Sequence, residues 1–127
     1  MRQKKILVVE DNEQNLYLIT FLLEKEQFSV VQARNGQEGL EMATSEQPDL
    51  ILLDIQLPMM DGYEVARRLK ESRDTQSIPI VAVTSYAMAG DREAVLAAGC
   101  EGYIEKPIDP DRFVEQVKGF LRIKNDD

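Results

Sequence analysis

Carboxylates stand at the ends of two apolar runs in this sequence. Residues 50–53 run into Asp54, and residues 6–9 run into Glu10 and Asp11. A continuous apolar run of this length indicates a strand that is buried on both faces of a parallel sheet. The carboxyl ends of parallel strands share one edge, and ligands bind at that edge in open α/β sheets. The sequence therefore predicts three carboxylates at one binding edge.

A hydroxyl and an ammonium group are expected at the same edge. A third apolar run, residues 80–83, ends in Thr84, and a shorter mixed strand ends before Lys106. Two carboxylates roughly 4 Å apart repel by on the order of 4 kcal/mol at an effective dielectric constant of about 20, so a shared proton or a cation must offset their charge. We favour a cation, and hard oxygen ligands suit Mg²⁺, with Mn²⁺ as the alternative, better than Ca²⁺. These groups together predict phosphoryl chemistry with Asp54 as the nucleophile.

The elements that position these groups alternate along the chain. Strand patterns at about residues 6–10, 28–32, 50–54, 80–84 and 102–105 are each followed by a helical pattern. This alternation predicts an α/β fold, a doubly wound parallel sheet with helices on both faces. The three apolar strands belong in its middle and the two mixed strands at its edges, which the order 2-1-3-4-5 satisfies. The last helix is expected to open with Asp109 as its cap and Pro110 as its first residue.

Composition limits the classes of function. The chain has 127 residues, which fits one domain over residues 1–127, and its net charge of −8 argues against direct binding of nucleic acid or an anionic membrane. Cys100 is the only cysteine and is expected to be buried, and the absence of histidine excludes His-based triads and His metal sites. With no leader and no apolar run near the roughly 18 residues of a membrane span, we expect a soluble, cytoplasmic protein. Met1 and the polar end at residues 124–127 favour a complete protein over a segment of a larger one.

A set of short motifs carries a family resemblance over essentially the whole chain. The set comprises Glu10-Asp11, Asp54 with Pro58 and Asp61-Gly62 beyond it, Thr84, and Lys106-Pro107. In this order and spacing it resembles the receiver domain of two-component response regulators, single-domain type. The resemblance implies a flavodoxin-like fold with five helices, for which the strand order 2-1-3-4-5 is already known.

The resemblance also implies a phosphorylation-activated signalling switch. Asp54 would accept a phosphoryl group from the phosphohistidine of a histidine kinase or phosphotransfer protein. Asp11, Asp54 and the main-chain carbonyl of Gln56 would hold Mg²⁺, with Glu10 acting mostly through water. Such a domain is a phosphoacceptor rather than an enzyme, with at most self-phosphorylation from small donors and self-dephosphorylation. Gln56 and Tyr86 would flank the water that hydrolyses the acyl phosphate, and since neither is an acid or a base, slow hydrolysis is expected.

The resemblance further implies how the signal leaves the site. Thr84 and Lys106 would grip the phosphoryl group, and Tyr103 matches the aromatic switch position that fills the space Thr84 vacates. A downstream protein would then contact the face made by the fourth helix, fifth strand and fifth helix. The residues expected on this face, besides Tyr103, are Met88, Ala89 and Val95. The chain itself is expected to be a monomer or a weak dimer.

Two other functions remain as alternatives. An Asp-nucleophile, Mg-dependent phosphohydrolase would share Asp54, but such enzymes usually carry a second Asp two residues later, where this chain has Gln56. A receiver fold that serves as an unphosphorylated scaffold tends to lose one of the site residues, and none is lost here. Nucleotide binding is disfavoured because no Gly-rich phosphate loop follows the first strand.

Overall fold

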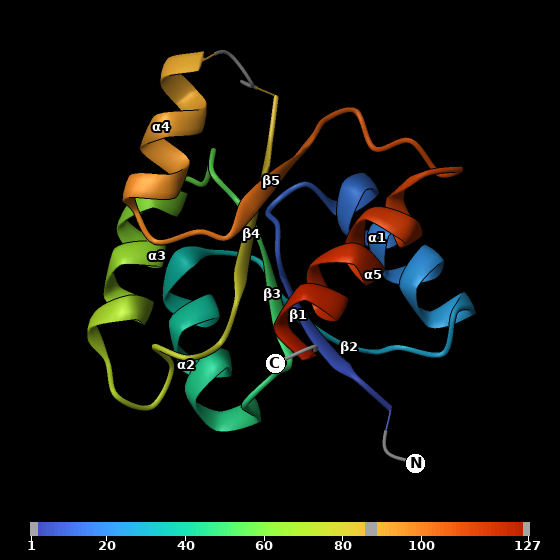
Figure 1. Ribbon diagram of the computed structural model, residues 1–127, viewed down its shortest axis with the longest axis horizontal. Coiled ribbons are helices and arrows are strands. Elements are labelled where there is room, and N and C mark those ends of the chain that lie inside the picture. The colour runs from blue at the N-terminus through green and yellow to red at the C-terminus, as the bar shows by residue number, and fades with distance from the viewer. Residues whose placement is uncertain (1–2, 86–88, 126–127) are drawn as a thin grey trace.

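The computed structural model of the chain describes residues 3–85 and 89–125. Within these ranges five parallel strands form one sheet in the order β2-β1-β3-β4-β5 (Figure 1). The strands are β1 (Lys5–Val9), β2 (Ser29–Ala33), β3 (Leu50–Asp54), β4 (Ile80–Thr84) and β5 (Gly102–Glu105). The helices are α1 (Glu13–Lys25), α2 (Gly36–Glu46), α3 (Gly62–Glu71), α4 (Ala89–Ala97) and α5 (Phe113–Asn125). The predicted flavodoxin-like fold and its strand order are confirmed.

The register of the sheet sets the strand tips side by side. Val9 pairs with Leu53 across β1 and β3, so the residue after β1 lies level with Asp54. Asp54 in turn pairs with Val83, the residue before Thr84. The two edge strands, β2 and β5, are the mixed ones, whereas every residue of β3 and β4 is buried. The contrast between apolar and mixed runs in the sequence therefore correctly predicted which strands lie in the centre of the sheet.

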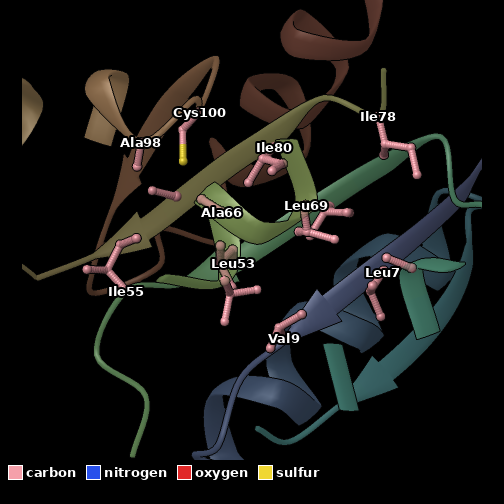
Figure 2. Close-up of a cluster of buried hydrophobic side chains, with 14 of the residues drawn as sticks. Leu7, Val9, Leu53, Ile55, Ala66, Leu69, Ile78, Ile80, Ala98 and Cys100 are labelled. Atoms are coloured by element: carbon pink, nitrogen blue, oxygen red, sulfur yellow. The ribbon is translucent and has the colours of Figure 1, made fainter. Parts of the chain in front are cut away.

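Each face of the sheet carries its own hydrophobic core. Alternate residues of β1 point to opposite faces, so Leu7 and Val9 pack under α2, α3 and α4, while Ile6 and Val8 pack under α1 and α5. Figure 1 shows the sheet between these two groups of helices. Figure 2 shows the first core, where Cys100 is buried, and burial raises the pKa of its thiol to about 12. No helix in the described ranges combines the length and apolar character needed to cross a membrane.

The start of α5 differs from the prediction. The helix begins at Phe113, and the three residues before it form a turn. Asp109 does cap this turn, because its Oδ1 accepts a hydrogen bond from the Asp111 amide at 3.0 Å. Its carbonyl accepts from the amides of Arg112 and Phe113. The placement of Pro110 as the first helical residue was therefore wrong, and regular helix starts where the buried Phe113 anchors the chain in the core.

Gly62 allows α3 to approach the end of β3. A Cβ atom at this position would lie 2.5 Å from the Ile55 Cα atom and 2.6 Å from the Asp54 carbonyl oxygen. Both are backbone atoms and cannot turn away, so Gly62→Ala should lower the free energy of unfolding by about 2 kcal/mol. Urea denaturation measures this change. The matched control is Gly90→Ala in α4, where the added methyl meets nothing within 4 Å and should raise stability by up to about 1 kcal/mol. Equal effects at the two positions would contradict the close approach.

Candidate functional site

Two carboxylates follow the end of β1 and differ in burial. Glu10 continues the strand backbone, since its amide donates a hydrogen bond to the Ala33 carbonyl at 2.9 Å. Its side chain is only 2% exposed, and Oε2 accepts a hydrogen bond from the Asn12 amide at 3.1 Å. Asp11 is exposed. The tip of β1 therefore offers one buried and one solvent-facing carboxylate.

Asp54 ends β3 as a buried carboxylate. Its side chain is 2% exposed, and Oδ1 accepts a hydrogen bond from the amide of Gln56 at 2.9 Å. The Gln56 side chain is exposed. This backbone hydrogen bond fixes the Asp54 carboxylate and was not anticipated from the sequence. The signal for it was available, since an Asp that ends a strand commonly bonds the amide two residues on.

The three carboxylates meet as the sequence predicted. One oxygen from each of Glu10, Asp11 and Asp54 lies within 4.8 Å of the other two. Glu10 Oε1 is buried and makes no aligned hydrogen bond among the described residues, but the Lys106 ammonium lies 3.0 Å from it, so this oxygen already faces a positive charge. The exposed side of the cluster at Asp11 leaves room for the waters that Mg²⁺ retains. The donor set therefore fits a hard divalent cation.

Lys106 brings a positive charge into the same cluster. Its Nζ atom lies 3.0 Å from Glu10 Oε1, without the alignment of a hydrogen bond, and 3.3 Å from Asp54 Oδ2. The peptide bond from Lys106 to Pro107 is cis. The sequence predicted Lys106 only as a contact for a phosphoryl group and did not include it among the groups that offset the carboxylate charge. Its place at a strand end on the same edge was the signal for this second role.

The charges shift one another's proton affinity. The pKa of Glu10 is raised to about 7, chiefly because burial disfavours the charged carboxylate; the charge of Asp54 also raises this pKa, while the Asn12 amide and Lys106 lower it. Burial alone would lower the pKa of Lys106, but its ion pairs with Glu10 and Asp54 outweigh burial, and the pKa is raised. Lys106 therefore remains an ammonium at neutral pH. A site in which burial and a neighbouring anion hold a carboxyl pKa near neutral favours an added positive charge.

Thr84 and Tyr103 lie on the two strands beyond Asp54. Thr84 ends β4, is 2% exposed and pairs with Glu105 on β5. Tyr103 stands two residues earlier on β5 and packs, partly buried, against the core under α3 and α4. Side-chain alternation places both residues on the same face of the sheet as Ala82.

Some residues that were singled out in the sequence are not described by the structure or lie elsewhere than predicted. Tyr86 and Met88 lie outside the residues that the structure describes. Val95 was expected on an exposed face, but its side chain is 1% exposed and packs in the core. Its neighbour Leu96 is 56% exposed. Consecutive helical residues point about 100° apart, and only one of these two can face the sheet.

Comparison with known proteins gives one consistent family. A family model described as the response regulator receiver domain matches residues 6–118. The polar-differentiation response regulator DivK of Brucella anthropi is 46% identical over 118 residues, which span 93% of this chain and 96% of that protein. A CheY-like response regulator receiver domain protein from Methanospirillum hungatei superposes with a TM-score of 0.90 at 32% identity over 98% of both chains.

A third relative carries a metal at its site. The receiver domain of a sensor histidine kinase from Pseudomonas aeruginosa PAO1 has a magnesium ion coordinated in its active site cleft. It matches with a TM-score of 0.84 and 31% identity, covering 96% of this chain and 97% of that one. The chain therefore belongs to the receiver domain family of two-component response regulators.

Proposed function

We propose that Asp54 is the phosphoacceptor of this receiver domain, which spans residues 1–127, and that a histidine kinase or phosphotransfer protein is the donor. In the transfer, an Asp54 carboxylate oxygen attacks phosphorus, the bond from phosphorus to the donor imidazole nitrogen breaks, and an acyl phosphate forms while the imidazole regains a proton. The observation that carries the proposal is the setting of Asp54. Its carboxylate is buried at a strand tip, fixed by the Gln56 amide, and 3.3 Å from the Lys106 ammonium.

The two oxygens of Asp54 have different environments. Oδ1 accepts the hydrogen bond from the Gln56 amide, and Oδ2 faces Lys106. The Lys106 ammonium supplies a positive charge that offsets negative charge on the transferred group. Thr84, at the neighbouring tip, supplies a hydroxyl on the far side of Asp54 from β1. Asp54, Lys106 and Thr84 are therefore the chain's own reacting groups in this proposal.

The metal in this proposal is Mg²⁺, with Mn²⁺ as the alternative. Asp11, Asp54 and the main-chain carbonyl of Gln56 would hold the ion, with Glu10 acting through water. Bound Mg²⁺ offsets negative charge on the phosphoryl group. The support comes from the three clustered carboxylates, whose negative charge the single ammonium of Lys106 offsets only in part.

Asp11 provides the clearest test of the metal site. Asp11→Asn removes one charged ligand, so Mg²⁺ affinity measured by titration calorimetry should fall at least tenfold, which corresponds to about 1.4 kcal/mol. Because the substitution relieves the repulsion of Asp11 by Glu10 and Asp54, the free energy of unfolding without metal should rise or stay unchanged, and should not fall. The matched control is Asp74→Asn, an exposed aspartate on the connector after α3. Equal Mg²⁺ affinity in both variants would remove Asp11 from the ligand set.

We further propose that the phosphoryl group draws Thr84 inward and that Tyr103 follows into the space. Tyr103 and Thr84 share one face of the sheet, on neighbouring strands, which supports a coupled movement. The change would alter the face of α4, β5 and α5, where a downstream protein binds. Leu96 takes the place of Val95 on the exposed side of α4. In this proposal the chain is a monomer or weak dimer and signals by protein contacts, without binding nucleic acid.

Wild-type protein tests the proposal against its alternatives. Incubation with acetyl phosphate and Mg²⁺, or with a phosphorylated histidine kinase, should add one phosphoryl group, detected by intact mass. A folded protein that gains none from either donor would instead be a receiver-fold scaffold. Sustained hydrolysis of a generic phosphomonoester would favour the phosphohydrolase. A phosphohydrolase of this kind would need a second acid two residues after Asp54, and the exposed Gln56 occupies that position.

A further inference from the structure

Arg92 of α4 lies against the ring of Tyr103. Its guanidinium carbon is 5.3 Å from the ring centroid, within the distance at which a cation interacts with an aromatic face. Arg92 is exposed and Tyr103 is partly buried. The contact links α4 to β5, two elements that pack side by side (Figure 1).

The backbone on both sides of Tyr103 is fixed. The amide of Glu101 donates to the Ile80 carbonyl at 2.7 Å, and the amide of Lys106 donates to the Thr84 carbonyl at 2.8 Å. On the other face of β5, Gly102 fits beneath Phe120, where a Cβ atom would meet the ring at 2.6 Å. The strand therefore has little freedom to shift, and a change at Tyr103 must come from rotation of its side chain.

The Tyr103 ring has two kinds of neighbour, which respond differently to a rotation of the ring. The ring packs against the core under α3 and α4, and the guanidinium of the exposed Arg92 lies over the ring. A charged guanidinium at the surface is hydrated and does not follow a ring into an apolar core without losing that water. Inward rotation of Tyr103 therefore separates the two groups.

We infer that Arg92 is a positioning residue for Tyr103, which it holds in the half-buried position and so opposes the inward rotation that accompanies phosphorylation. This inference rests on the proposed switch role of Tyr103. The contact biases an equilibrium between two ring positions, and removing it favours the inward one. A ligand that binds only the inward state then gains apparent affinity in proportion to the fraction of protein in that state.

The test uses beryllofluoride with Mg²⁺, which mimics an acyl phosphate. Arg92→Gln keeps an unbranched polar side chain and a similar helix propensity but removes the cation, and should tighten beryllofluoride binding two- to fivefold, equivalent to about 0.4–1 kcal/mol. Arg92→Lys restores a cation and should bring the affinity back toward the wild-type value. The matched control is Glu93→Gln, which removes the charge of the next exposed residue on α4 and should leave the affinity unchanged.

Two further measurements separate positioning from a general effect on α4. In protein without metal or beryllofluoride, the NMR signals of the Tyr103 ring should shift in Arg92→Gln and not in Glu93→Gln. In a Tyr103→Leu background, Arg92→Gln should no longer change beryllofluoride affinity, because the ring it acts on is gone. Unchanged ring signals, weaker beryllofluoride binding, or the same effect in the Tyr103→Leu background would overturn the inference.

Failure of the proposed function would look different. If Asp54 is not the phosphoacceptor, wild-type protein will not bind beryllofluoride at all, while the ring signals still report the contact with Arg92. If Asp54 is the phosphoacceptor and Arg92 has no influence on Tyr103, wild type and Arg92→Gln will bind beryllofluoride equally.

Discussion

Asparagine at position 54 should leave the protein folded and unable to accept a phosphoryl group. The amide has the shape of the carboxylate, and its oxygen can still accept the hydrogen bond that the Gln56 amide now gives to Oδ1. It lacks the anionic oxygen that attacks phosphorus. The substitution also removes a charge that raises the pKa of Glu10, so this pKa should fall in Asp54→Asn. The loss of phosphorylation is therefore expected without a loss of structure.

Intact mass after incubation with acetyl phosphate and Mg²⁺ measures the effect. Wild type should gain one phosphoryl group and Asp54→Asn none, with circular dichroism showing that both are folded. Asp74→Asn, an exposed aspartate elsewhere, serves as the matched control and should be labelled like wild type. Labelling of Asp54→Asn at the wild-type rate would assign the phosphoacceptor to another residue.

The sequence sufficed for the fold because strand burial is visible in residue types. Runs such as residues 50–54 contain no polar residue before the terminal Asp54, which requires a position covered on both faces. The mixed residues of β2 and β5 suit edges, where part of each strand stays accessible. Once the central strands were set, their ends had to meet, and the cluster of Glu10, Asp11 and Asp54 followed.

Features that depend on side-chain direction could not be predicted in the same way. Lys106 was assigned to the correct edge, but a flexible four-carbon side chain can turn to solvent or inward, and only the structure shows its ammonium between Glu10 and Asp54. The prediction that Val95 lies on the exposed side of α4 was wrong for a related reason. With Val95 and Leu96 adjacent and both apolar, the sequence offers no choice between them, and contact with the sheet decides that Val95 is buried.

Lys106→Met should slow phosphorylation and at the same time tighten Mg²⁺ binding. The ammonium offsets charge on the transferred phosphoryl group, and loss of one such preorganised contact costs about a hundredfold in rate. In the protein without metal, however, the same ammonium occupies oxygens of Glu10 and Asp54 and so competes with the cation. Methionine keeps most of the side-chain volume and removes that competition. Opposite changes in rate and metal affinity are thus expected from one substitution.

The two opposite changes distinguish a local charge effect from damage to the fold. Phosphorylation rates with acetyl phosphate at saturating Mg²⁺ and Mg²⁺ affinity by calorimetry are measured on wild type, Lys106→Met and Lys118→Met. Lys118 of α5 forms an ion pair of 3.1 Å with Glu26, the residue that caps the C-terminus of α1, with both side chains more than a third exposed. Its replacement should alter neither quantity. Unfolding or loosening of the site would weaken Mg²⁺ binding together with phosphorylation, because both need the carboxylates in place. A parallel loss in Lys106→Met would therefore show that Lys106 supports the structure of the site rather than its charge balance.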